Sequence, residues 1–176
     1  QKLLSAEIAG SVKKIGFHAF GDCYQLLYVT IGYGVEIIGE EAFCNCESLL
    51  TLEIPDSVKK IDYNAFDDCI NLTDVSIGKG VSEIYGSVFS GCRKLESIVV
   101  DEDNEHYLNV EYGALYDKRK TTLIAYPSGS SMTEYVIPDG VTDISGMNLE
   151  NDTNLTKLTI PGSVTTIRTY EICDST

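Results

Sequence analysis

An interval of 23 residues recurs along the first hundred positions and constrains the fold more than any other feature. It separates the members of six columns, each of which keeps one kind of apolar residue through four copies. The columns are Val12, Val35, Val58 and Val81; Ile15, Ile38, Ile61 and Ile84; Phe20, Phe43, Phe66 and Phe89; Cys23, Cys46, Cys69 and Cys92; Leu26, Leu49, Leu72 and Leu95; and Ile31, Ile54, Ile77 and Val100. Because six columns do not keep step by chance, we expect one structural unit to stack on the next.

Each repeat carries the pattern of a short strand, over residues 27–31 and their equivalents. Side chains alternate across a strand, so Val29 and Ile31 should face the core while Tyr28 and Thr30 face solvent. Glycine or proline turns follow each strand, and the Ala-Phe segment is predicted to form one or two helical turns. The sequence therefore predicts an α/β repeat solenoid. It would be right-handed and leucine-rich-repeat-like, with a parallel sheet of short strands and short helical turns.

The repeat is interrupted once, after Val100. Residues 112–116 and 121–126 flank the polar segment 117–120, a spacing that predicts a β-hairpin. We therefore expect a single repeat domain over 1–176. Its parts are the end of a preceding repeat (1–11), four 23-residue repeats (12–100), an insert with the hairpin (101–134) and degenerate final repeats (135–176). Solenoids normally end in polar capping repeats and none is recognisable, so we expect the chain to be a segment of a longer array.

The composition argues against two classes of partner. A formal net charge of −14 and a pI near 4.4 repel nucleic acid phosphates and anionic lipid. No apolar run is long enough to cross a bilayer, and the first residues lack the apolar region of a signal peptide. We therefore expect neither nucleic acid binding nor membrane insertion.

The cysteines and acidic residues could be read as metal ligands. However, Cys23, Cys46, Cys69 and Cys92 recur once per repeat rather than in a zinc-binding cluster, which favours a ladder of buried thiols. Parallel Cβ vectors oppose disulfides along that ladder, whereas Cys44 and Cys173 are expected off it and more exposed. Asp101, Asp103 and Glu105 alternate like the start of a calcium loop, but His106 occupies the position that requires glycine. No metal site or cofactor is predicted.

Catalysis is likewise not indicated. His18 and His106 are the only histidines, and neither has a recognisable nucleophile partner, so both are interpreted as solvated surface residues. A hydrolase would need a pocket with convergent titratable groups, which a regular solenoid face does not offer. We predict that the chain is not an enzyme.

The unit Ala-Phe-x-x-Cys-x-x-Leu, together with Ile54-Pro55-Asp56-Ser57-Val58, resembles the BspA-like, treponemal-type leucine-rich repeat family. The resemblance covers about 140 of the 176 residues. Members are typically secreted or surface-anchored proteins of host-associated bacteria and some protozoan parasites, and several are adhesins. The resemblance implies an extracellular or cell-surface location. Because the family has no fixed binding motif, it transfers no binding residue to this chain.

The predicted function is a non-catalytic binding or adhesion module. Its outward strand residues would be presented to a protein or glycan ligand, including one from a host. The candidate binding residues are Tyr28, Thr30, Thr51, Glu53, Asp74, Ser76, Ser97 and Val99. They are small and polar with one aromatic, a composition that favours weak or multivalent binding. The alternative is a structural spacer or stalk within a larger surface protein. The pattern predicts no particular oligomeric state.

Overall fold

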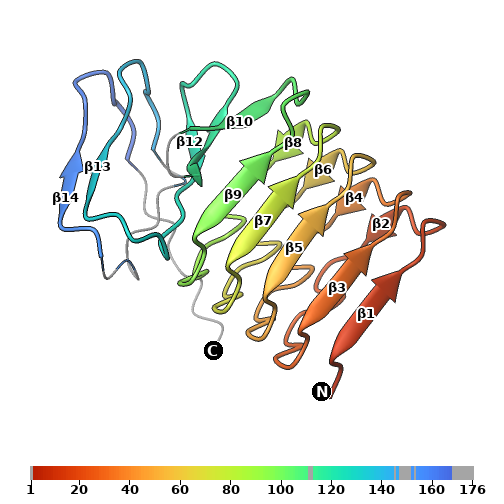
Figure 1. Ribbon diagram of the computed structural model, residues 1–176. Coiled ribbons are helices and arrows are strands. Elements are labelled where there is room, and N and C mark those ends of the chain that lie inside the picture. The colour runs from red at the N-terminus through yellow and green to blue at the C-terminus, as the bar shows by residue number, and fades with distance from the viewer. Residues whose placement is uncertain (1, 111–112, 145, 147–151, 153, 168–176) are drawn as a thin grey trace.

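The chain coils into a β-solenoid, and the computed structural model describes residues 2–110, 113–144, 146, 152 and 154–167. Four-residue strands lie side by side along its front (Figure 1). They are β1 (Ser5–Ile8), β3 (Tyr28–Ile31), β5 (Thr51–Ile54), β7 (Asp74–Ile77) and β9 (Ser97–Val100). Two-residue strands form a second layer, namely β2 (Lys14–Ile15), β4 (Ile37–Ile38), β6 (Lys60–Ile61) and β8 (Glu83–Ile84). One coil is thus one repeat of the sequence.

The 23-residue interval fixes the strand register. Thr51 pairs with Asp74 and Asp74 with Ser97, so equivalent residues of successive coils lie next to each other in parallel strands. The front strands form two hydrogen-bonded groups, β1-β3 and β5-β7-β9, while β2, β4, β6 and β8 form one four-stranded sheet. Because the side-chain period of a strand is two, this register sends every inward residue to the same core.

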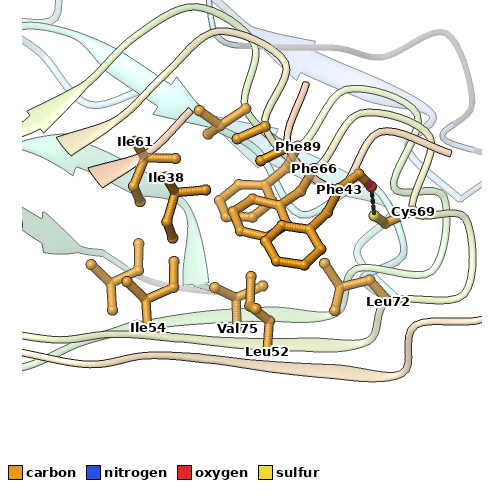
Figure 2. Packing of buried hydrophobic residues seen from close by; sticks show 14 of the residues in the cluster. Ile38, Phe43, Leu52, Ile54, Ile61, Phe66, Cys69, Leu72, Val75 and Phe89 are labelled. Carbon is orange, nitrogen blue, oxygen red and sulfur yellow. Dashed lines mark hydrogen bonds between the residues drawn. The ribbon is translucent and has the colours of Figure 1, made fainter. Parts of the chain in front are cut away.

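The core is organised around a single file of phenylalanine rings (Figure 2). Ring centroids lie 5.1 Å apart between Phe20 and Phe43, 5.4 Å between Phe43 and Phe66, and 5.7 Å between Phe66 and Phe89. The rings are close to parallel, with interplanar angles of 2°, 5° and 17°. Phe43 and Phe66 are fully buried, whereas Phe20 in the first coil is half-buried. The predicted alignment of the phenylalanine column is confirmed.

The predicted helical turns are wrong: the described residues contain no α-helix. His18 and Asp22 both have positive φ, 50° and 59°, so only three residues lie between two left-handed positions and a helix cannot propagate. The backbone bonds to the neighbouring coil instead. The Phe20 amide donates to the Ala42 carbonyl, and the Phe43 amide donates to the Ala65 carbonyl, both at 2.8 Å. The fold class is therefore a parallel β-solenoid rather than an α/β solenoid.

The insert is a three-stranded antiparallel meander of β10 (Tyr107–Asn109), β11 (Leu115–Asp117) and β12 (Leu123–Ala125). The predicted hairpin is present as β11 and β12. The Asp117 carboxylate fixes its turn by accepting hydrogen bonds from the Thr121 amide at 2.7 Å and the Thr122 amide at 2.5 Å. Two parallel strands follow the insert, β13 (Glu134–Val136) and β14 (Lys157–Thr159).

Asn104 and Tyr107 end the second layer of strands. Asn104 lies 23 residues after Val81 and is buried, and its amide nitrogen donates to the Val81 carbonyl at 3.0 Å and the Gly78 carbonyl at 3.1 Å. Its amide oxygen accepts from the Tyr107 backbone amide at 2.8 Å. The Tyr107 hydroxyl in turn accepts from the Ile84 amide at 2.9 Å. Side-chain groups thus satisfy the backbone at the end of the β2-β4-β6-β8 sheet.

The buried side chains form two clusters rather than one. The larger extends from Ile8 through the four regular coils to Ala125. The smaller is built around Tyr116 of the hairpin and Tyr135 of β13, whose hydroxyls are 2.8 Å apart. The insert therefore separates the regular stack from the final coils and supplies part of the core of the latter.

Candidate functional site

The exposed surface with the most regular geometry is the sheet face, defined as the outward side chains of β1, β3, β5, β7 and β9. These strands alternate outward and buried residues, as the register requires. The residues of the sheet face are Ser5, Glu7, Tyr28, Thr30, Thr51, Glu53, Asp74, Ser76, Ser97 and Val99. All are exposed except Ser97, which is half-buried. Tyr28 and Val99 are the exposed large hydrophobic residues of this face, at 56% and 55% of their full surface.

The structure brings the eight predicted binding residues together in two groups. Thr51, Asp74 and Ser97 form one row across β5, β7 and β9. A second row on the same strands contains Glu53, Ser76 and Val99. Tyr28 and Thr30 lie on β3, which is hydrogen-bonded as a strand to β1 and not to β5. Both groups lie on the front of the solenoid (Figure 1).

The sheet face is acidic and partly fixed by hydrogen bonds. The Asp74 carboxylate accepts from the Thr73 hydroxyl at 2.7 Å and from the Ser97 hydroxyl at 2.9 Å. Asp74 shares the face with Glu7 and Glu53, and none of the ten residues is cationic. Such a surface attracts hydrogen-bond donors and cations and repels acids.

Ser5 and Glu7 belong to the sheet face although they are absent from the predicted set. Ser5 pairs with Tyr28 and Glu7 with Thr30, and both are exposed. The signal was present in the sequence, because residues 3–11 match residues 49–57 in pattern. The Lys157 and Thr159 side chains of β14 are also exposed, on the separate sheet of β13 and β14.

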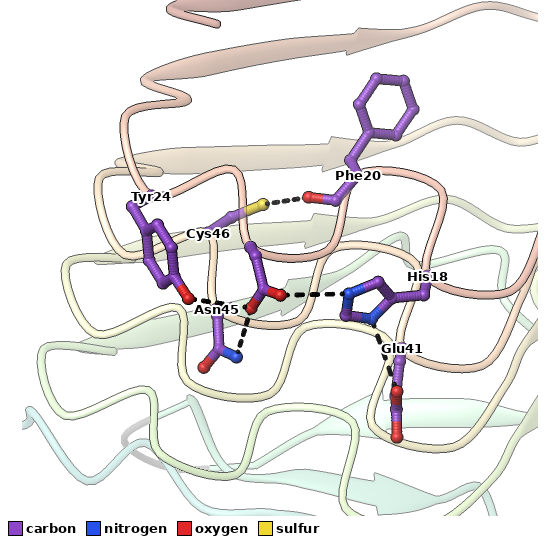
Figure 3. Close-up of polar contacts among 7 residues, drawn as sticks. His18, Phe20, Tyr24, Glu41, Asn45 and Cys46 are labelled. Carbon is purple, nitrogen blue, oxygen red and sulfur yellow. Dashed lines mark hydrogen bonds and ion pairs between the residues drawn. The ribbon is translucent and has the colours of Figure 1, made fainter. Parts of the chain in front are cut away.

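A second polar cluster lies on the turn face, the surface formed by the turns that carry the phenylalanines (Figure 3). His18 Nε2 is 3.4 Å from Asp22 Oδ2, and His18 Nδ1 is 3.5 Å from Glu41 Oε2. The hydrogen bond that Asn45 donates to Asp22, at 2.9 Å, lowers the pKa of that carboxyl. His18 is half-buried rather than fully solvated as predicted, whereas His106 is exposed in the insert. The two histidines are not brought together.

Burial changes the acid–base properties of two further groups on the turn face. Desolvation, reinforced by the neighbouring Asp68 carboxylate, raises the pKa of Asp67 to about 6. Desolvation together with the charge of Asp67 raises the pKa of the Cys44 thiol to about 12. Cys44 is half-buried, less open than predicted, and Cys173 lies outside the described residues. A thiol with so high a pKa is a poor nucleophile at neutral pH.

The cysteine ladder lies in the core. Cys23, Cys46, Cys69 and Cys92 are all buried, and no disulfide joins any of the five cysteines that the structure describes. Burial raises the pKa of the Cys46 thiol well above its ordinary value. These groups are therefore thiols with a packing role and not thiolate ligands.

Over the described residues, no three histidine, cysteine, aspartate or glutamate side chains converge on one point where they could hold a metal ion. In the 101–105 loop the Asp101 carboxylate accepts a hydrogen bond from the Asp103 amide at 2.9 Å, which fixes the loop's own backbone. Within the same ranges, no helix has the length and apolar character needed to span a membrane.

Comparison with solved structures finds bacterial leucine-rich repeat proteins. A leucine-rich repeat protein from Eubacterium ventriosum is 28% identical with a TM-score of 0.72, over 93% of this chain and 49% of that one. The leucine-rich repeat protein of T. pallidum is 27% identical with a TM-score of 0.55, over 89% of this chain and 56% of that one. The pneumococcal vaccine antigen PcpA is 23% identical with a TM-score of 0.63, over 92% and 51% of the two chains, and shares the fold.

The chain thus spans about half the length of the solved proteins that it resembles. Comparison with curated proteins found no match. Six copies of the BspA type leucine rich repeat region match residues 1–122 and 119–176. Together with the 23-residue columns and the stacked coils, this match shows that the chain belongs to the BspA-type leucine-rich repeat family.

Proposed function

We propose that this chain is a non-catalytic binding or adhesion module of a secreted or cell-surface protein. It presents the sheet face to a protein or glycan partner. The observation that carries the proposal is the register of the outward side chains: two rows run in step across β5, β7 and β9, and every member is exposed except the half-buried Ser97. A row of adjacent groups on a rigid support can contact an extended ligand at several points at once.

The chemistry of the sheet face favours modest affinity at each point of contact. Strong hot spots are rich in Trp, Tyr and Arg, whereas this face has Tyr28 as its one aromatic residue and no cation. Hydroxyls and carboxylates dominate it, and they suit hydrogen bonding to sugars, peptide amides or basic side chains. Affinity would then come from many weak contacts along the array.

The similar proteins support the proposal of a binding module but do not identify its ligand. The family consists of repeat modules, and a pneumococcal protein with this fold is named as a vaccine antigen. The proposed extracellular or cell-surface location rests on the family resemblance. The alternative proposal, a spacer or stalk within a larger surface protein, needs the stacked core but no ligand.

The test is a binding screen with a matched pair of variants. Immobilised glycans and host matrix proteins are screened with the purified chain, and each hit is measured again with two triple-alanine variants. One variant removes Tyr28, Glu53 and Val99 from the sheet face. The control removes Phe17, Glu40 and Tyr63, which are exposed on the turn side.

The sheet-face variant should weaken binding by about tenfold or more, the loss of one or two moderate contacts, while the control stays within about twofold. Equal loss in both variants would show that the sheet face is not the binding surface. A screen without any hit would favour the spacer alternative.

A further inference from the structure

The ladder of backbone bonds between coils is interrupted beside β9. In the regular coils the Thr73 carbonyl accepts from the Glu96 amide at 2.8 Å, and in the final coils the Thr133 carbonyl accepts from the Thr156 amide at 2.8 Å. Over the described residues no equivalent bond joins Glu96 to Thr133. The last bond before the break runs from the Gly129 amide to the Leu95 carbonyl at 2.9 Å. Strand β13 therefore does not cover the edge of β9.

The insert enters the space between β9 and β13 and covers only part of that edge (Figure 1). The Asn109 side-chain oxygen accepts a hydrogen bond from the Val100 amide at 3.0 Å. Gly113 lies against the Ile98 peptide, where an added Cβ atom would be 3.1 Å from the Ile98 nitrogen. Gly113 has a φ of +77°, so both its backbone conformation and this close approach require glycine. Ser97, Ile98 and Val99 of β9 also line a hollow beside the insert.

That space is a groove of about 490 Å³, a volume that accommodates a side chain with its flanking peptide. Three segments line it: the end of the fourth coil with β9, the insert, and the approach to β13. The lining residues are Glu96, Ser97, Ile98, Val99, Asn109, Gly113, Gly129, Ser130, Ser131 and Met132.

Among the described residues that line the groove, Glu96 is the one acidic residue and is exposed, and none is cationic. Hydroxyl and amide groups supply further hydrogen-bond acceptors, and Val99 supplies exposed apolar surface, whereas Ile98 and Met132 are buried. An aliphatic chain that ends in a cation matches this combination, because its stem can pack on the apolar part while its head reaches the carboxylate. An acidic side chain would meet Glu96 and the field of a chain with a net charge of −14.

We propose that this groove binds a lysine or arginine side chain of an extended peptide segment in a protein partner. The inference rests on the proposed function and names the partner chemistry at one end of the same sheet face, since Ser97 and Val99 belong to both. The stem of the basic residue lies along the exposed Val99. Its cationic head pairs with the Glu96 carboxylate in a charge-assisted hydrogen bond.

The test uses the whole chain labelled with ¹⁵N and a short peptide as the probe. Acetyl-Gly-Ser-Lys-Ser-Gly-amide is titrated into the protein while amide chemical shifts are recorded. Two matched peptides replace the lysine with norleucine or with glutamate. The lysine peptide should shift the amides of Ser97, Ile98 and Ser131, and the norleucine peptide should bind about fivefold more weakly or worse, because it keeps the stem and lacks the charge.

Two protein variants separate the local carboxylate from the overall charge. Glu96→Gln should weaken binding of the lysine peptide about three- to fivefold. Glu102→Gln removes an exposed carboxylate from the 101–105 loop, and its affinity for the peptide should stay within about twofold of wild type. The spectra also report whether each variant is folded. No shift in the groove at millimolar peptide, equal binding of the lysine and norleucine peptides, or equal effects of the two variants would overturn the inference.

Failure here is distinguishable from failure of the proposed function. If the sheet-face triple variant loses binding to a partner from the screen, but the lysine peptide causes no amide shifts in the groove, only the groove assignment fails. If the peptide binds in the groove and the screen yields no partner for the sheet face, the broader proposal fails and the groove stands by itself.

Discussion

The thiol of Cys69 donates a hydrogen bond to the carbonyl oxygen of Phe43, 3.3 Å away and one coil back. Figure 2 shows this bond, and Figure 3 shows the same bond from Cys46 to Phe20, at 3.3 Å; a third runs from Cys92 to Phe66 at 3.2 Å. Each of these thiols therefore bonds to the backbone of the phenylalanine in the preceding coil. The ring of that phenylalanine stacks on the phenylalanine ring of the cysteine's own coil. This relationship accounts for the shared interval of the two residues: the ring packs along the stack, and the thiol adds a bond between coils to a carbonyl that also accepts from the backbone of its own coil, as Phe43 does from the Cys46 amide at 3.2 Å.

Removal of a central ring should destabilise the whole stack. Phe66 is fully buried between Phe43 and Phe89, so Phe66→Ala leaves a cavity with ring faces on both sides. The expected loss in free energy of unfolding is about 3–5 kcal/mol, measured by urea denaturation. Phe20→Ala is the matched control, because Phe20 is half-buried and stacks on one neighbouring ring. This variant should lose clearly less free energy of unfolding than Phe66→Ala. A loss below about 1 kcal/mol for Phe66→Ala would contradict the packing described here.

The thiols should differ in reactivity according to burial. Cys44 is half-buried, while Cys46 and Cys69 are buried in the ladder, and all three have raised pKa values that reduce the thiolate fraction. Native protein treated with iodoacetamide should therefore be alkylated at Cys44 before the ladder cysteines, as followed by site-resolved mass spectrometry. Alkylation in denaturant, where all sites should react alike, is the control. Equal native rates at Cys44 and Cys69 would show that the ladder opens easily.

The 23-residue columns predicted the stacking, the alternation along each strand predicted its outward residues, and the two segments flanking residues 117–120 predicted the hairpin. Each depends on spacing and alternation, which are local properties of the chain. The helical turns were predicted wrongly because apolar spacing does not report backbone conformation. Positive φ at His18, Glu41 and Asn64 prevents a helix in each coil, and the recurring Asp22, Asn45 and Asp68 were a signal for a second left-handed position.

The groove could not be predicted in the same way. It exists because the insert pairs with the end of β9 and keeps β13 away from it, a consequence of contacts between distant segments. The positions of Asn104 and Tyr107 in the stack are closer to being predictable, because the two residues lie 23 residues after Val81 and Ile84. Both carry polar groups, whereas the columns of Val81 and Ile84 are otherwise apolar, so the 23-residue pattern alone does not place them.

The stability of the stack should depend on pH through Asp67. Burial raises its pKa from about 3.8 in the unfolded chain to about 6, so the folded state binds more protons between those values. Its contribution to stability is fully present below about pH 4 and is lost as the pH rises through 6. Asp67→Asn removes the charge. The free energy of unfolding of this variant, relative to wild type, should therefore increase by about 1–2 kcal/mol from pH 4 to pH 7, after allowance for solvent screening.

Thermal or urea unfolding across this pH range measures the effect. Asp103→Asn, which removes one exposed carboxylate from the 101–105 loop, controls for the change in net charge. If Asp67→Asn and Asp103→Asn gave the same profile, the burial of Asp67 would not be the cause.

The side chains that end the second layer should be among the most sensitive polar residues. Asn104→Ala leaves the Val81 and Gly78 carbonyls and the His106 and Tyr107 amides without their partner in a buried site. The expected loss is about 2–4 kcal/mol in urea denaturation, since buried polar groups would be left unpaired.

Tyr107→Phe tests the second half of the same arrangement. It removes only the hydroxyl that accepts from the Ile84 amide, so the loss should be smaller, about 1–2 kcal/mol. Asn154→Ala is the control, because Asn154 also donates to a carbonyl one coil back, that of Ser130, but is exposed, and its loss should stay below about 1 kcal/mol. If Asn104→Ala cost no more than Asn154→Ala, water would satisfy the end of the sheet and the buried amide would not be what terminates the regular stack.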